Sequence, residues 1–431
     1  MKDHVTSPVD SDLLPSPSDY SPGLRCVTDE GLWYYADCGP VERQGWKLYV
    51  SFTPFNARIV LGRIIPVLVR YGIPFKYLRR LNDVNRLNSG ILGYSQIGKC
   101  LVCYVAEANH ALIRDLFAAC SSLGDAAPAV PFARKIRDGI PMYYRYGAYR
   151  GSKLLIGGSM RADERGNYRQ AVPEGIHDWL QDYAHPAPED AGFRSFLLNY
   201  PAFCALHQQG KSGIFRALNI RSESYAEVIL KIGYRNGALQ RDGADGRTFL
   251  RNEIRVYTAL RANNLDEVAP AVVDFFDDGE RVALVLERIY GEDLLSLRLA
   301  GSLTPADVRQ AWDILDRLHQ AGFVVGDAKI GNFLRDRAGQ VFILDFESGA
   351  TPLQDPADQH KLQTFRVSTP EKCNDQVYDK LHFLTSVMFD YRQDGVSVNE
   401  ARPVDLRSYL CDQPRDEIER WAGARISELL Q

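Results

Sequence analysis

The sequence predicts an α+β protein of two domains. Its 431 residues exceed the length of a typical single domain. Short apolar strands and amphipathic helices occur in both halves of the chain. Residues 151–199, rich in Pro, Gly and charged residues, separate the halves, so we place the domain boundary near residue 185. Residues 1–24 are polar and rich in Ser, Pro and Asp, and we expect a disordered tail there.

The first domain, residues 25–185 including the connector, is predicted to be a compact α+β unit. Apolar residues at helical spacing predict helices over residues 54–71 and 109–123. Strands are predicted around GWKLYVSF, IPFKYLRR, KCLVCYV and MYYRYGAY, with a polar loop through Asn82, Asn85 and Asn88. The first helix is expected to end at Gly72 and to bury Ile59, Val60, Ile64, Val67 and Leu68.

Four cations and one tyrosine stand out in these strands: Lys47, Tyr49, Lys76, Lys99 and Arg145. The first two alternate on one strand and therefore point to the same face. A single Lys in an apolar strand is usually an edge residue whose ammonium reaches water. Four cations on separate strands favour a shared anion pocket. Residues 25–150 carry 17 Lys and Arg against nine Asp and Glu, which fits such a pocket but also an ordinary basic surface.

The second domain, residues 186–431, carries the spacing of a phosphoryl-transfer site. Asp327 follows an apolar helix, Asn332 lies five residues later, and Asp345 ends the strand VFILDF. An Asp in the first place accepts the proton of an acceptor hydroxyl, while the Asn and the second Asp hold Mg²⁺ on the nucleotide phosphates. Lys329 is placed to neutralise charge on the transferred phosphoryl group. This pattern indicates a kinase that uses ATP or GTP with Mg²⁺.

The amino-terminal lobe of such a kinase is found upstream in the expected order. Gly210 and Gly213 form a short glycine turn, which fits a loop over the phosphates and equally a plain hairpin. Lys231 ends the strand YAEVILK and is expected to pair with the nucleotide phosphates and with Glu253 on the next helix. Backbone from Glu287 to Ile289 is expected to face the base. The second domain is therefore predicted to be bilobal and protein-kinase-like. Pro370, Glu371 and Asp379 fall where anchors of its carboxy-terminal lobe are expected, and residues 412–430 predict a final amphipathic helix.

Two departures separate this domain from signalling kinases. Val325 and Gly326 precede the catalytic Asp where His and Arg are usual, and Glu347 replaces the Gly of the DFG motif. Without that Arg, the usual clamp on a phosphorylated activation loop is missing. We therefore expect a constitutively assembled site, closer to small-molecule and lipopolysaccharide kinases.

Composition narrows the partners and the compartment. A net charge of −4 argues against general nucleic-acid binding. The chain has no apolar stretch near the ~20 residues that a membrane span needs, and no signal peptide. Eight scattered Cys fit a reducing cytoplasm. Cys100 and Cys103 form a single C-x-x-C within a strand, which favours core packing over metal or redox chemistry.

Taken together, GWKLYVS, IPFKYLR, SQIGK, YYRYGAY, VVGDAKIGNFL and FILDFE resemble the class III lanthipeptide synthetases over roughly residues 30–390. Members of that family join a phosphoserine/phosphothreonine lyase domain, a kinase domain and a carboxy-terminal cyclase. The lyase part is similar to phosphothreonine lyases that bacteria inject as effectors. The resemblance implies a phosphothreonine-lyase-like first domain and a substrate that is a ribosomal precursor peptide with a leader.

The resemblance also implies roles for the cations of the first domain. Lys76 is the base that removes the α-proton, which requires the neutral amine, and Lys47, Lys99 and Arg145 hold the phosphate. Tyr49 stands where the family usually has a His that donates a proton to the leaving phosphate. Because a phenol has a pKa near ~10, Tyr49 is a weaker acid, and reduced or absent lyase activity is an alternative.

The chain ends at Gln431, so no cyclase is expected within it and it should dehydrate without cyclising. A separate cyclase, spontaneous closure or no ring would complete the product. The main alternative function is a small-molecule kinase of the aminoglycoside-phosphotransferase type, with a first domain that only binds substrate. A regulatory pseudoenzyme is disfavoured because Lys231, Asp327, Asn332 and Asp345 are all present.

Overall fold

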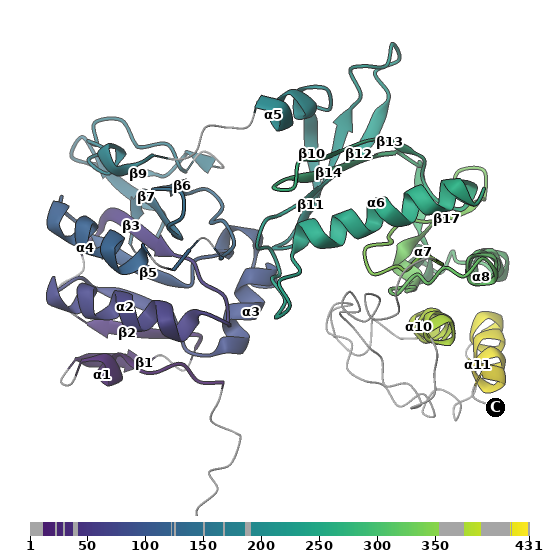
Figure 1. Cartoon of the computed structure of the whole chain (residues 1–431), viewed down its shortest axis with the longest axis horizontal. Helices are drawn as coiled ribbons and strands as arrows, with labels where there is room; N and C mark the ends of the chain where they lie inside the picture. The colour runs from purple at the N-terminus through teal and green to yellow at the C-terminus, as the bar shows by residue number, and fades with distance from the viewer. Residues whose placement is uncertain are drawn as a thin grey trace, which may run out of the picture. The chain divides into compact units, whose positions relative to one another are not determined.

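A computed structural model of the chain describes residues 12–21, 24–28, 31–37, 42–121, 123–124, 126–149, 151–166, 169–185, 191–352, 375–388, 414 and 416–429. It divides into two compact units. The first unit is Met1–Arg194 with His207–Gly213 and Tyr234–Gly246, and the second is Ser195–Leu206, Ile214–Gly233 and Arg247–Gln431. Figure 1 colours the first mostly purple to blue and the second teal to yellow. The mixed α+β character predicted from the sequence is confirmed.

The first unit is built on a seven-stranded sheet in the order β1-β2-β4-β5-β3-β7-β6. The described pairings between neighbouring strands are antiparallel. Its strands are β1 (Arg25–Thr28), β2 (Trp33–Asp37), β3 (Gln44–Val50), β4 (Phe75–Leu78), β5 (Leu101–Val105), β6 (Arg134–Lys135) and β7 (Met142–Ala148). A separate hairpin, β8 (Lys153–Ile156) and β9 (Ser159–Ala162), follows.

One face of this sheet is covered by the helices α2 (Ala57–Arg70) and α4 (His110–Cys120). Leu48, Phe75 and Tyr144 from the sheet and Ile64 and Leu112 from the helices share one hydrophobic core. Cys100 and Cys103 are free thiols buried in that core, as expected for packing residues. Side chains that alternate with these strand residues therefore point to the opposite face of the sheet.

Three sequence expectations about the first unit are wrong. Ile59 is 57% exposed because it lies on the outer side of α2. The predicted loop through Asn82–Asn88 is the helix α3 (Leu81–Ser89), whose Val84 and Leu87 are buried. Residues 12–21 of the predicted tail are ordered and include α1 (Pro17–Tyr20): Leu14 is buried, and the Tyr77 hydroxyl donates to the Pro15 carbonyl. Residues 1–11 lie outside the described part.

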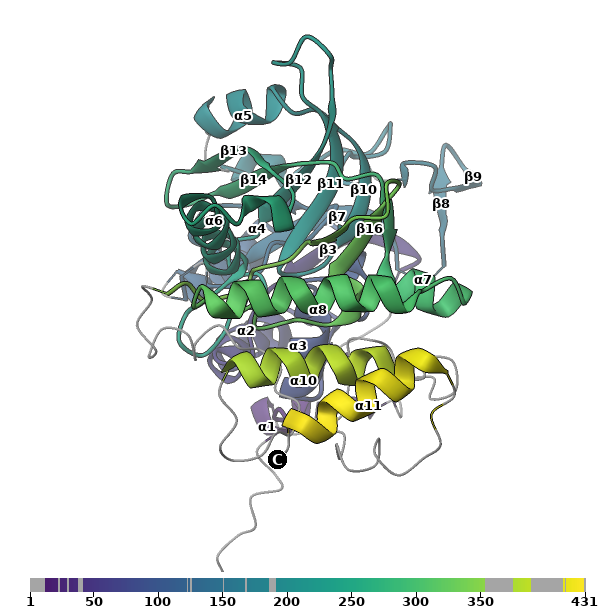
Figure 2. The same ribbon diagram turned by 90° about the vertical axis from the view of Figure 1, so that its right-hand side faces the viewer.

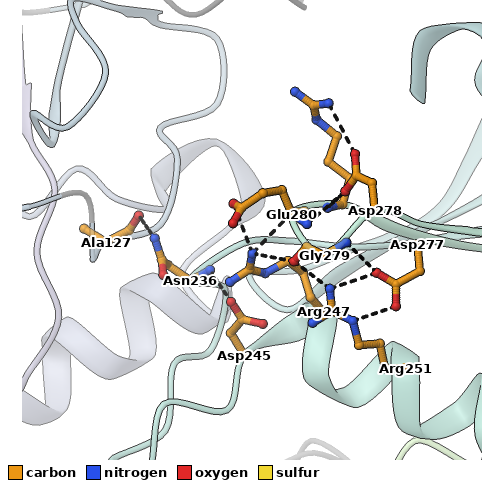
Figure 3. Close-up of polar contacts among 10 residues, drawn as sticks. Ala127, Asn236, Asp245, Arg247, Arg251, Asp277, Asp278, Gly279 and Glu280 are labelled. Carbon is orange, nitrogen blue, oxygen red and sulfur yellow. Dashed lines mark hydrogen bonds and ion pairs between the residues drawn. The ribbon is translucent and has the colours of Figure 1, made fainter. Parts of the chain in front are cut away.

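The second unit begins with α5 (Ala191–Leu198) and a five-stranded sheet in the order β10-β11-β12-β14-β13. The strands are β10 (Ala202–Gln208), β11 (Ser212–Leu218), β12 (Glu227–Gly233), β13 (Val272–Asp277) and β14 (Val282–Glu287), and α6 (Gly246–Ala262) lies along one side of them (Figure 1). Arg251 makes a bidentate ion pair with Asp277, and Arg247 forms an ion pair with Glu280. These contacts fix α6 to the β13–β14 turn (Figure 3).

The rest of the second unit is mostly helical. It contains β15 (Gly291–Asp293), α7 (Leu294–Ala300), α8 (Pro305–Gln320), β16 (Phe333–Asp336), β17 (Val341–Ile343), α10 (Asp375–Met388) and α11 (Glu417–Leu429). Helices α8, α10 and α11 pack together (Figure 2) around a core that includes Leu315, Leu384 and Ile426. The final helix predicted for residues 412–430 is confirmed as α11. The predicted lobe anchors Pro370 and Glu371 lie outside the described residues.

The glycine turn between β10 and β11 packs within the first unit, against the end of α3. The Gly210 N–H donates to the Ser89 carbonyl over 2.9 Å. A Cβ on Gly210 would lie 1.7 Å from the Asn88 carbonyl oxygen, so only glycine permits this approach. The loop 234–246 also belongs to the first unit, where the Asn236 amide donates to the Ala127 carbonyl over 3.2 Å (Figure 3). Both segments lie beyond the predicted boundary near residue 185.

Candidate active sites

The first site lies on the face of the seven-stranded sheet that α2 and α4 leave uncovered. We call it the cationic face and define it by Lys47, Tyr49, Lys76, Lys99 and Arg145. Lys47 on β3 is directly opposite Arg145 on β7. Tyr49 on β3 and Lys76 on β4 both pair with Val102 on the intervening strand β5. Directly paired residues share a face, so the register brings these four side chains together.

Tyr49 lies at the centre of this face. The Arg145 Nε donates to the Tyr49 hydroxyl oxygen over 2.8 Å, and the Lys99 Nζ lies 5.4 Å from the centre of the Tyr49 ring. Tyr49 is 2% exposed and Lys99 6% exposed. Because the phenol oxygen accepts from Arg145, its own O–H is oriented to donate elsewhere. All five residues selected from the sequence therefore lie on one side of the sheet, with Lys99 joining from the segment before β5.

Lys76 has neighbours that the sequence reasoning missed. Its Nζ lies 4.2 Å from the centre of the Trp33 ring and 5.5 Å from that of Tyr35. Both rings come from β2, where Tyr35 pairs with Lys76 across the strands. Contact with ring faces orients an ammonium and excludes water from it. The signal was present as an aromatic strand, Trp33–Asp37, but its pairing with β4 is a long-range contact that the local pattern does not specify.

The pKa values of two lysines on this face are lowered. Burial, reinforced by Arg145, lowers the pKa of Lys99 to about 7 and that of Lys47 to about 8. Burial raises the pKa of Tyr49, and the Arg145 guanidinium only partly opposes this. The positive charges are thus crowded and incompletely neutralised, which favours a bound anion. The raised pKa also makes Tyr49 a weaker proton donor than an unburied phenol.

Arg169 adds a further positive charge that was not predicted. It lowers the pKa of both Lys47 and Lys99. Arg165 holds this part of the chain in place, since it pairs with both oxygens of Asp163 and donates to the carbonyls of Tyr146 and Arg169. Tyr146 follows Arg145 directly on β7. No strand or helix pattern marks Arg169, so the sequence offered no signal for it.

The second site lies in the second unit and is rich in carboxylates. We call it the acidic site and define it by Lys231, Glu253, Asp327, Asn332 and Asp345. Lys231 on β12 pairs with Glu253 on α6 over 2.5 Å and lies 4.0 Å from Asp345. Lys231 is 9% exposed and Glu253 2%. The predicted pairing of Lys231 with Glu253 is therefore present.

At the acidic site the pKa of the buried lysine is raised, whereas on the cationic face the pKa values of Lys47 and Lys99 are lowered. Burial acts to lower the pKa of Lys231, but the Glu253 and Asp345 carboxylates outweigh it and raise that pKa. Burial, together with Asp345 and Glu347, raises the pKa of Glu253 against the effect of Lys231. The carboxylates thus exceed the cations, and a bound cation would relieve their repulsion.

Asp327 is held by its own loop. Its Oδ2 pairs with the Lys329 Nζ over 2.7 Å, and the Asn332 amide donates to the Asp327 carbonyl over 2.8 Å. The start of the loop is fixed by the buried Asp379, whose carboxylate accepts from the backbone N–H groups of Val325 and Gly326. Asp379 was expected from the sequence to be an anchor of this lobe.

The structure explains why Gly326 replaces the usual Arg. Its φ is +80°, a conformation that favours glycine, and a Cβ would lie 2.2 Å from the Ser348 carbonyl oxygen. A side chain at this position would therefore displace the segment that follows Asp345. The same segment is tied to α6, because the Asn252 amide donates to the carbonyls of Glu347 and Gly349.

The donor set of the acidic site suits Mg²⁺. Asn332 uses its amide nitrogen on the loop, which orients its oxygen away, and Asp345 supplies a carboxylate. Mg²⁺ in nucleotide sites takes one or two protein oxygens and completes its shell with phosphates and water. Among the described residues there is no cluster of three or more His, Cys, Asp or Glu that could hold a metal ion.

Four other residues, Gly210, Gly213, Glu287 and Ile289, were predicted to contact the nucleotide. The N–H of Gly210 is used on α3, and that of Glu287 donates to the Ala271 carbonyl. Gly213 is buried in β11, and Ile289 follows the end of β14. Roles for Gly210, Gly213, Glu287 and Ile289 in nucleotide binding stay predictions.

Within the described residues no helix is both long and apolar enough to cross a bilayer.

Comparison with known proteins bears on both units. Residues 20–185 match the family model described as RamC, N-terminal domain. The chain is 29% identical over 336 residues to the Probable SapB synthase of Streptomyces coelicolor, covering 71% of this chain and 35% of that protein. It is also 28% identical over 100 residues to the 3-deoxy-D-manno-octulosonic acid kinase of Xylella fastidiosa strain M23, covering 23% of this chain and 40% of the kinase.

These similarities support the broader part of the resemblance stated from the sequence. The chain is similar to class III lanthipeptide synthetases, and the match to the RamC domain covers every residue of the cationic face. The aligned region spans about a third of the Probable SapB synthase and two fifths of the kinase.

Proposed function

We propose that the protein is a bifunctional peptide dehydratase of lanthipeptide-type biosynthesis. The acidic site phosphorylates Ser or Thr of a ribosomal precursor peptide with ATP or GTP and Mg²⁺. The cationic face then eliminates phosphate to leave dehydroalanine or dehydrobutyrine. A precursor peptide with a leader is the partner that this function implies.

The acidic site supports phosphoryl transfer through its pairing and its charge. Phosphoryl transfer calls for a lysine held by a glutamate, a catalytic carboxylate and oxygen ligands for the metal ion. The Lys231–Glu253 pair, the contact of Asp327 with Lys329 and the Asn332 amide on the Asp327 carbonyl support this assignment. The excess of carboxylates favours Mg²⁺, which Asn332 and Asp345 would hold and which would supply positive charge to the nucleotide phosphates. Asp327 would accept the proton of the acceptor hydroxyl, and Lys329 would neutralise charge on the transferred group.

The cationic face supports elimination. Lys76 would remove the α-proton as a neutral amine, the electron pair would form the C=C bond, and the C–O bond to phosphate would break. Lys47, Lys99 and Arg145 would hold the departing phosphate and stabilise its charge. Tyr49 would donate a proton to the phosphate, although its raised pKa makes it a weak acid. Direct loss of an unphosphorylated hydroxyl would be slow, which explains why two activities share one chain.

The observation that carries this proposal is the gathering of Lys47, Lys76 and Arg145 on one sheet face around Tyr49, with Lys99 beside it. A domain that only bound substrate would have no need for four crowded cations, two of which, Lys47 and Lys99, have lowered pKa values.

The test compares two variants by mass spectrometry of a candidate precursor incubated with ATP and Mg²⁺. Asp327→Ala should give unmodified peptide, whereas Lys76→Ala should accumulate phosphopeptide. A synthetic phosphopeptide supplied without nucleotide should lose phosphoric acid with Asp327→Ala but not with Lys76→Ala. Dehydration at the parental rate by Lys76→Ala would show that this lysine is not the base.

A second candidate function is a small-molecule kinase whose first unit only binds substrate. The similarity to 3-deoxy-D-manno-octulosonic acid kinases and the Tyr at position 49 favour it. In that case the parent would release no phosphate from a phosphopeptide, and it would transfer the γ-phosphoryl group to a sugar but not to a peptide.

A further inference from the structure

A histidine of α10 faces the catalytic carboxylate of the acidic site and has no role in the chemistry described so far. The His382 Nδ1 lies 3.8 Å from the Asp327 Oδ1. That nitrogen is buried, and it has no hydrogen-bond partner among the described residues. An unpaired polar atom in a buried position is rare because it has lost its hydrogen bonds to water. Leu would fill the same space without that loss.

The placement of His382 follows from the spacing of three side chains on α10. Asp379, His382 and Ser386 are separated by three and four residues, so they lie on one face of the helix. Asp379 accepts from the backbone N–H groups of Val325 and Gly326, just before Asp327. Ser386 accepts from the Ile330 N–H over 2.8 Å, three residues after Asp327. His382 is thus between two contacts that fix the loop on either side of the catalytic residue.

The two oxygens of the Asp327 carboxylate have different surroundings. Oδ2 is held by the Lys329 Nζ over 2.7 Å and lies 3.3 Å from the Asn332 amide nitrogen. Oδ1 is directed toward His382. A carboxylate held at one oxygen can still turn about its Cβ–Cγ bond, whereas one held at both cannot.

We propose that His382 is a positioning residue for phosphoryl transfer, which donates its Nδ1–H to the Asp327 Oδ1 when nucleotide and peptide are bound. This inference rests on the proposed kinase function of the acidic site. The gap of 3.8 Å is longer than a hydrogen bond, and contacts of this kind in unliganded enzymes commonly shorten in the reactive complex. The bond orients the lone pair of Asp327 that receives the hydroxyl proton.

The surroundings of His382 favour the neutral imidazole that this role requires. Burial lowers the pKa of His382, and the Lys329 ammonium acts in the same direction against the carboxylates of Asp327 and Asp379. The Tyr378 ring, one turn earlier on α10, lies 5.7 Å from the imidazole centre and limits its rotation. The neutral ring can therefore present one N–H toward Asp327.

The kinetic test uses three substitutions that differ in where they place a donor. His382→Asn keeps an amide nitrogen near the position of Nδ1, His382→Gln carries its amide farther out, and His382→Leu has none. We expect His382→Leu to lower kcat for phosphopeptide formation from ATP, Mg²⁺ and a candidate precursor by roughly 10- to 100-fold, with little change in KM. His382→Asn should recover most of kcat and His382→Gln little.

Lys380→Leu is the matched control on the same helix, because it removes an ion pair with Asp316 that lies outside the site. It should leave kcat unchanged even where it lowers the Tm. Parental kcat in His382→Leu would overturn the proposal. Equal loss of kcat in the Leu and Asn variants would also overturn it, because that pattern indicates packing alone.

A spectroscopic test separates this proposal from the kinase assignment. In the full-length protein labelled with ¹⁵N-histidine, the resonances absent from His382→Asn identify His382. Their shifts should show the proton on Nδ1, and Asp327→Ala should move it toward Nε2. A proton on Nε2 in the parent would refute the positioning role whatever the enzyme phosphorylates. If the parent forms no phosphopeptide while the Nδ1 proton is present, the proposed substrate is wrong and the pairing with Asp327 stands.

Discussion

The cationic face and the acidic site both contain buried or half-buried lysines, yet the two environments shift the pKa values of those lysines in opposite directions. On the cationic face burial and neighbouring cations lower the pKa of Lys47 to about 8 and of Lys99 to about 7. At the acidic site the carboxylates outweigh burial and raise the pKa of Lys231 and of Lys329. A lysine thus becomes a proton acceptor or a permanent cation according to the charges around it.

The largest effect is expected from removing the Lys231 ammonium at the acidic site. Lys231→Met should lower phosphoryl transfer by about 10²- to 10³-fold, because the nucleotide phosphates lose a cation. It should also reduce the free energy of unfolding by about 3 kcal/mol, since Glu253 is left buried without its partner. Phosphopeptide kinetics and chemical denaturation measure the two effects. Elimination from a synthetic phosphopeptide should be unchanged.

The double variant Lys231→Met/Glu253→Leu is the control for this prediction. It removes the unpaired carboxylate and should recover most of the lost stability but none of the phosphoryl transfer. Recovery of activity in the double variant would contradict the role of the pair in nucleotide binding.

The next effect concerns Tyr49, the residue proposed to donate a proton on the cationic face. Tyr49→His should raise the rate of elimination by about 10-fold at acidic pH, because an imidazolium gives up its proton more readily than a phenol. The gain should shrink toward neutral pH, because burial and the neighbouring cations lower the pKa of an imidazole below its ordinary value of about 6.5. Release of inorganic phosphate from a synthetic phosphopeptide measures the rate. Tyr49→Phe should be slower than the parent. Equal rates for all three proteins would mean that the phosphate leaves without a donated proton.

A smaller effect is expected for Lys99, whose lowered pKa should make the free energy of unfolding depend on pH. Its pKa is about 7 in the folded chain against an ordinary value of 10.5, so the unfolded chain binds more protons between those values. The free energy of unfolding should therefore rise with pH from about 7 toward 10. Lys99→Met should flatten this rise and increase the Tm near pH 7 by roughly 2–4 °C for each kcal/mol recovered.

Inorganic phosphate provides the control for Lys99. It should stabilise the parent more than the Lys99→Met variant, because bound anion offsets the crowded charge. A Tm that falls in Lys99→Met at pH 7 would argue that the ammonium has a stabilising partner on this face.

The smallest effect is expected for Arg169, which acts on the cationic face from an exposed position. Arg169→Ala should raise KM for a synthetic phosphopeptide by roughly 3-fold and leave kcat near the parental value, because exposed charges are screened. The difference should shrink at 0.5 M salt. A large loss of kcat would instead place Arg169 against the departing phosphate.

Local patterns predicted those parts of the two sites that lie within single strands, helices or loops. Spacing alone placed Asp327 near Lys329 and Asn332, and alternation placed Lys47 and Tyr49 on one face. Trp33, Arg169 and His382 were missed because each reaches its site through pairing or packing between distant segments. The loop predicted over Asn82–Asn88 is a helix because the buried Val84 and Leu87 outweigh the low helix propensity of asparagine.

The docked glycine turn has a practical consequence. Residues 207–213 and 234–246 fold with the first unit although the chain passes through the second unit between and after them. A gene cut once near codon 185 would therefore deprive the amino-terminal fragment of both segments. The Ser89 carbonyl in that fragment would lose the hydrogen bond that it accepts from the Gly210 N–H. Dissecting the two proposed activities calls for inactivating substitutions in the intact polypeptide rather than for separate halves.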